Sequence, residues 1–157
     1  MQSLWKETRD VTLKCGLAIT VRHVGSEDDP FMWDTIRAAW VTSLEKARVD
    51  ARRSMRAEHG SLGKAVEDAQ ADAREMGADA DAVNAITPHV LVERRVDSNA
   101  LFSRYVKDVV SAGASVGEAR GHDAYKAIFA EGGPSALVEA FNAVHDFNAV
   151  KASTGEA

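Results

Sequence analysis

Residues 29–60 read DPFMWDTIRAAWVTSLEKARVDARRSMRAEHG, and the rest of the chain can be placed around this stretch. Asp29 is suited to cap a helix, because its carboxylate can accept hydrogen bonds from the free amides of the first turn. Pro30 suits the first helical position, and Gly60 suits the stop because it can take the left-handed conformation. The stretch therefore predicts one long amphipathic helix. Its apolar stripe, at spacings of three and four, consists of Ile36, Trp40, Leu44, Ala47, Ala51 and Met55.

Residues 9–24, before the long helix, alternate apolar and polar side chains on either side of Gly16. Period two with β-branched residues predicts two strands, and Gly16 can supply the positive φ of a tight turn between them. An isolated hairpin is marginally stable in water. We therefore expect its apolar face to dock on helices or on another protein.

A second helix is expected from a Ser61 cap to about Met76, with a short helical segment over 78–86. Residues 46–56 are rich in arginine, whereas residues 67–81 are rich in aspartate and glutamate. If the chain turns back at Gly60, a basic helix face meets an acidic one. Exposed pairs of this kind contribute roughly 0–1 kcal/mol each, so the pattern would set pairing more than stability.

The remainder also favours helices. Residues 89–92 form a short apolar run, interpreted as a third strand or a buried connector, and residues 113–121 are expected to be a flexible loop. Residues 98–113 carry an amphipathic helix, and Gly132-Gly133-Pro134 is expected to end one helix and start the last. The predicted fold class is mainly α, with a small N-terminal β-hairpin. We expect a single domain over 1–151 and a flexible tail over 152–157.

Composition narrows the function classes. The chain has 157 residues, 45% of them hydrophobic and 27% charged, and a net charge of −5, which makes a general nucleic-acid-binding role unlikely. The single cysteine, Cys15, allows no internal disulfide and favours a reducing compartment. With no signal peptide pattern and no run of roughly 18 apolar residues, we expect a cytoplasmic protein without a membrane span.

No catalytic or metal-binding signature emerges. The five histidines lack metal-ligand spacing, and Cys15 could act as a nucleophile only if a distant histidine approached it. We therefore expect no enzyme activity, no metal and no cofactor. The candidate partner-binding residues lie on the long helix, where arginines spaced i, i+4 could also follow phosphates. They are Trp33, Trp40, Arg48, Arg52, Arg53 and Arg56.

The order of elements resembles the tail assembly chaperones of long-tailed bacteriophages. Three segments carry this resemblance: the strand pair over 11–22, the Leu101-Phe102-Ser103-Arg104-Tyr105-Val106 helix, and Gly133-Pro134-Ser135-Ala136-Leu137-Val138-Glu139-Ala140-Phe141 before a polar tail. The resemblance implies a non-enzymatic, mainly helical protein of the host cytoplasm. It would bind the tape measure protein and tail tube subunits, and it could self-associate.

Two alternatives stay open. One is a structural virion protein, such as a head–tail connector subunit. The other is a factor that binds nucleic acid or a host polymerase through the basic helix face.

Overall fold

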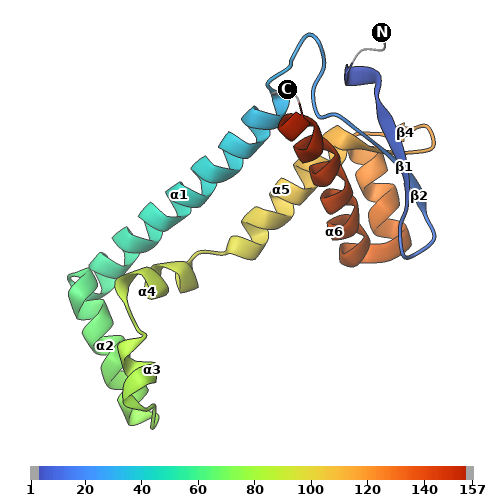
Figure 1. Cartoon of the computed structure of the whole chain (residues 1–157). Coiled ribbons are helices and arrows are strands. Elements are labelled where there is room, and N and C mark those ends of the chain that lie inside the picture. Colours follow the sequence, from blue (N-terminus) through green and yellow to red (C-terminus); the bar gives the residue numbers. More distant parts are fainter. Residues whose placement is uncertain (1–3, 155–157) are drawn as a thin grey trace. The chain divides into compact units, whose positions relative to one another are not determined.

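A computed structural model describes residues 4–154 (Figure 1). The chain groups into two compact units. Unit 1 comprises Met1–Ala39 and Phe102–Ala157, and unit 2 comprises Trp40–Leu101. The sequence predicts one domain over 1–151, whereas the structure divides this range because a helical excursion of about sixty residues packs mainly within itself.

Unit 1 is built on a four-stranded antiparallel sheet with strand order β1-β2-β3-β4. A short 3₁₀ helix, Leu4–Lys6, precedes β1 (Thr8–Thr12), which pairs with β2 (Ala18–Arg22) as the predicted hairpin. Thr20 and Val21 of β2 pair in turn with Ser115 and Ala114 of β3 (Ala114–Val116). Strand β4 (Ala119–Arg120) pairs with β3 and forms the other edge of the sheet.

The second hairpin corrects the sequence expectation for residues 113–121. These residues were expected to be a flexible loop, because they hold three glycines and only short apolar stretches. Segments this short have no recognisable alternation, so they become strands only through pairing: β3 pairs with β2, and β4 pairs with β3. Ala114 and Ser115 are buried against the rest of unit 1, which explains their ordered pairing.

The sheet is covered by α6 (His122–Thr154), which contacts β2, β3 and β4 (Figure 1). The core between them contains the side chains of Ile19, Val21, Ile128 and Val144, joined by Val109 and Val110 of α5 (Ser98–Gly113). Asn148 of α6 links the helix to the end of β2. Its side-chain oxygen accepts from Val24 N–H at 2.9 Å, and its side-chain nitrogen donates to the Arg22 carbonyl at 3.3 Å. The predicted docking of the hairpin on a helix is thus confirmed.

Helix α6 is interrupted at Gly133, where φ is 66° and ψ is −158°. This backbone region is open essentially only to glycine. Pro134 follows it at the start of the second helical segment, where its missing amide costs no hydrogen bond. The predicted break at Gly132-Gly133-Pro134 is therefore present. The tail predicted over 152–157 begins as helix up to Thr154, and residues 155–157 lie outside the described residues.

Unit 2 is entirely helical in its described elements. It contains most of α1 (Met32–His59), followed by α2 (Leu62–Glu75), α3 (Ala80–Asn84), α4 (Pro88–Arg95) and the first turn of α5. The Ser61 hydroxyl accepts from Lys64 N–H at 3.0 Å, which confirms Ser61 as a cap. A small apolar cluster holds the unit together: Ala51, Met55, Ala65, Val92 and Val96.

Two local expectations in this unit need adjustment. The long helix begins at Met32 rather than at Pro30, because Asp29 and Ser26 close a turn on each other through their backbone groups. Residues 89–92 belong to α4 and are neither a strand nor a connector. Thr87 caps this helix by accepting from Val90 N–H, and Pro88 occupies its first turn, so local capping overrides the β-branched composition.

The predicted fold class is confirmed: the protein is mainly α-helical with a small N-terminal hairpin. Among the described residues, none of the helices is long and apolar enough to cross a membrane.

Candidate functional site

A run of aromatic rings connects three helical segments of unit 1. The Phe141 ring of α6 lies 5.5 Å from Phe102 and 5.4 Å from Tyr105, both on α5, with near-perpendicular planes. His145 is 5.9 Å from Phe141 and 5.6 Å from Trp33 at the start of α1. Such edge-to-face pairs are favoured by the ring quadrupoles. The side chains thus form one continuous aromatic cluster.

This cluster is only partly covered. Phe141 and Tyr105 are buried, and burial raises the pKa of the Tyr105 phenol above its ordinary value. Phe102 remains 39% exposed, and Val138, one turn before Phe141 on α6, remains 43% exposed. We call Trp33, Phe102, Val138, Phe141 and His145 the aromatic surface. It presents apolar area to solvent over a rigid, buried base.

The two candidate tryptophans have separate environments. Trp33 is half-buried and belongs to the aromatic surface, whereas Trp40 is half-buried within unit 2. The sequence analysis grouped both as candidate partner-binding residues on the long helix. The structure assigns them to different units, so only Trp33 is part of the aromatic surface.

Of the four candidate arginines on α1, Arg48 differs from the others because it is held in ion pairs. Arg48 donates to Glu45 at 2.6 Å and to Glu93 of α4 at 2.7 Å, and these bonds raise the pKa of its guanidinium. In the part of the chain that the structure describes, Arg52, Arg53 and Arg56 make no ion pair. Arg53 and Arg56 are exposed, and Arg52 is half-buried.

The sequence predicted that this basic face pairs with the acidic second helix, α2. This prediction is wrong, because the observed partner of Arg48 lies on α4. Helix α4 supplies charged partners to α1: Glu93 binds Arg48 of the basic face, and Arg95 binds the acidic Glu58. The one charged contact between α1 and α2 among the described residues is His59 Nδ1 to Asp68 Oδ2, at 2.8 Å. Sequence reasoning missed α4 because residues 89–92 were not interpreted as helical.

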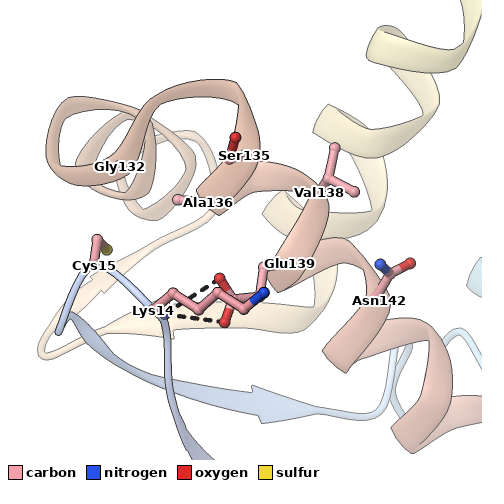
Figure 2. A pocket seen from close by; sticks show the side chains of 8 residues that line it. All are labelled: Lys14, Cys15, Gly132, Ser135, Ala136, Val138, Glu139 and Asn142. Atoms are coloured by element: carbon pink, nitrogen blue, oxygen red, sulfur yellow. Dashed lines mark hydrogen bonds between the residues drawn. The ribbon is translucent and has the colours of Figure 1, made fainter.

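A pocket of about 320 Å³ lies between the tip of the N-terminal hairpin and the kink of α6 (Figure 2). The Lys14 N–H donates to both carboxylate oxygens of Glu139, at 3.0 and 3.3 Å. Cys15 is exposed, and a Cβ at Gly132 would lie only 3.1 Å from its sulfur. The kink therefore admits the hairpin tip because residue 132 has no side chain.

This pocket lacks the parts of a nucleophilic site. No histidine lines it, and both oxygens of Glu139, the carboxylate in its lining, accept from the Lys14 amide. A cysteine of the Cys–His type is activated by an adjacent general base that takes the thiol proton. The contacts instead fix the hairpin to α6.

The described residues also contain no group of three or more histidine, cysteine, aspartate or glutamate side chains that could hold a metal ion. His145 Nδ1 lies 4.0 Å from Asp146 Oδ1, too far for a hydrogen bond. No family model, curated protein or solved structure matches this chain.

Proposed function

We propose that this protein is a non-enzymatic assembly factor that binds another protein through the aromatic surface of unit 1. The observation that carries the proposal is that the exposed Phe102 ring lies 5.5 Å from the buried Phe141 ring, with the exposed Val138 one turn before Phe141 on α6. Interface centres are enriched in aromatic side chains, and a preformed apolar surface binds without a large ordering cost.

The resemblance to phage tail assembly chaperones supplies the proposed partner. In that role the chain acts in the host cytoplasm and shields an apolar segment of the tape measure protein until tail tube subunits arrive. An apolar helical segment is the natural occupant, because a helix presents side chains at i, i+3, i+4 and i+7 to a surface of this kind.

The test is co-purification with the tape measure protein encoded in the same phage genome, followed by titration calorimetry. Phe102→Asp and Val138→Asp should each weaken binding at least tenfold, because each places an unpaired charge in a desolvated contact. Phe129→Asp is a matched control, since Phe129 is also exposed on α6 but makes no contact with the aromatic cluster among the described ring contacts.

Absence of binding by the wild-type chain, or equal weakening by the Phe129 control, would contradict the proposal. Circular dichroism of all three variants distinguishes lost binding from lost folding.

A second candidate function is binding of nucleic acid through α1. Arg52, Arg53 and Arg56, which make no ion pair among the described residues, favour it, although the nearby Asp50 reduces the local positive potential. Phosphate contacts give affinity that falls steeply with salt. A mobility shift at low salt that disappears in the triple arginine-to-alanine variant would support this function, and no shift at low salt would exclude it.

A further inference from the structure

Unit 2 contains a second pocket, of about 260 Å³, that the proposed function does not use. Its lining includes the apolar side chains of Met55, Ala65 and Leu91, which belong to the packed cluster of this unit or lie against it. Charged side chains from α2 and α4 complete the lining. The pocket therefore combines a few apolar side chains with a larger number of ionisable groups.

Most of the charges near this pocket are already paired. Asp68 accepts from His59 Nδ1 at 2.8 Å and from Lys64 Nζ at 3.1 Å, and these bonds lower the pKa of its carboxyl. Because the ionised carboxylate can only accept, Nδ1 of His59 carries the proton in this contact. Arg95 is held by Glu58, with Nη1 2.9 Å from Oε1, and this pairing raises the pKa of Arg95.

Two charges in the lining remain unpaired. Arg94 of α4 and Asp72 of α2 are exposed, and neither makes an ion pair or a side-chain hydrogen bond among the described residues. They have opposite sign and come from different helices. Within the described part of the chain, one unpaired cation and one unpaired anion therefore line the same pocket.

We propose that this pocket binds a small zwitterion with an aliphatic body, of the class of free α-amino acids such as leucine. Arg94 is suited to the carboxylate, because a guanidinium binds carboxylates in a bidentate fork. Asp72 is suited to the ammonium group, and the base formed by Met55, Ala65 and Leu91 to the aliphatic side chain.

The charges in the pocket lining favour a zwitterion over a ligand with a single charge. The lining contains two arginines, Arg94 and Arg95, and two aspartates, Asp68 and Asp72, so it has no net preference for a cation or an anion. A ligand with a single charge would satisfy only one of the two unpaired groups. The pocket volume, slightly below the usual range for drug-sized ligands, also favours a small molecule.

The test is titration of the full chain, by calorimetry and by amide chemical shifts, with three probes of similar shape. Leucine has both charges, 4-methylpentanoate only the carboxylate, and isoamylamine only the ammonium group. Leucine should bind with shifts centred on α2 and α4, and each singly charged probe should bind at least tenfold more weakly.

Substitutions then assign the two charges. Arg94→Gln should weaken leucine at least tenfold and leave isoamylamine unchanged, whereas Asp72→Asn should weaken leucine and leave 4-methylpentanoate unchanged. Lys46→Gln and Asp50→Asn are matched controls at exposed positions of α1, outside the pocket lining, and should change nothing.

No shift with leucine up to millimolar concentration would overturn the proposal, as would equal affinity for the singly charged probes. Leucine binding that survives both pocket substitutions would also overturn it. Because the aromatic surface belongs to unit 1, failure here leaves the protein-binding result unaffected, and the two hypotheses are tested separately.

Discussion

The two units achieve stability by different means. The fully buried large side chains of unit 1 come from strands and helices far apart in the sequence, such as Ile19, Val109 and Val144. In unit 2 the core is a small cluster around Met55, and it is accompanied by ion pairs whose side chains remain 28–51% exposed. Burial of apolar area contributes much more than exposed ion pairs. We therefore expect unit 2 to be the less stable part of the chain.

The largest loss of stability is expected from a substitution in the core of unit 1. Phe141→Ala removes a buried ring that contacts Phe102, Tyr105 and His145, and should destabilise the protein by about 3–5 kcal/mol. Phe102→Ala is the comparison, and it should cost clearly less because 39% of Phe102 is already exposed. Urea unfolding monitored by circular dichroism measures both. Equal losses would show that Phe102 is as important to the core as Phe141.

Met55→Ala tests the core of unit 2. Met55 is 1% exposed within the apolar cluster, so its truncation should cost about 2–5 kcal/mol. Hydrogen exchange should show faster exchange in residues 40–101 and little change in the sheet, because local opening follows cooperative units. A uniform acceleration over the whole chain would show that the two units unfold together.

A smaller effect is expected at the contact between α5 and α6. A Cβ at Gly113 would lie 2.3 Å from Cγ1 of the buried Val144, so Gly113→Ala forces one of the helices to move. Overpacking of this kind costs about 1–3 kcal/mol. The double substitution Gly113→Ala with Val144→Ala should recover part of that loss in thermal unfolding. If the double variant recovers no stability, the clash with Val144 is not the cause of the destabilisation by Gly113→Ala.

The smallest effect is expected for the ion pairs of unit 2, whose contribution to stability should depend on pH. The hydrogen bonds from Arg95 lower the pKa of the Glu58 carboxyl, and those from His59 and Lys64 lower that of Asp68. Groups with lowered folded-state pKa values stabilise the protein above their unfolded pKa values, near 4, and lose this contribution as the pH falls through the folded values. Glu58 is exposed and Asp68 is only half-buried, so the change should be small.

The measurement is the difference in unfolding midpoint between wild type and the Glu58→Gln, Asp68→Asn double variant. This difference should be present at pH 7, decrease below about pH 4, and decrease with added salt. A difference that is independent of pH would mean that the side chains act through packing and not through charge.

Local signals in the sequence were sufficient for most of the helices. The Ser61 cap, the break at Gly133-Pro134 and the apolar stripe of α1 each depend on residues within a few positions of one another. The alternation around Gly16 likewise predicted the first hairpin. Such features follow from backbone geometry and capping, which act within a turn or two of the chain.

The candidate site depended on longer-range contacts. Trp33 and the arginines were selected by their spacing on one helix, yet Trp33 contacts His145, and Arg48 contacts Glu93. No local pattern identifies such partners, because the separations exceed one hundred residues in the first case and forty in the second. The exposure of Phe102 was also not evident, since an amphipathic stripe does not indicate how completely each member is covered.

By itself, the sequence determined the mainly helical class, the N-terminal hairpin and the end of the long helix before Gly60, because propensity, capping and periodicity are local. Only the tertiary structure decided that β3 and β4 join the sheet, that residues 89–92 are helical, and that the chain groups into two units. These features depend on which distant surfaces bury one another. The same reason explains why Arg94 and Asp72 border one pocket although they lie on different helices.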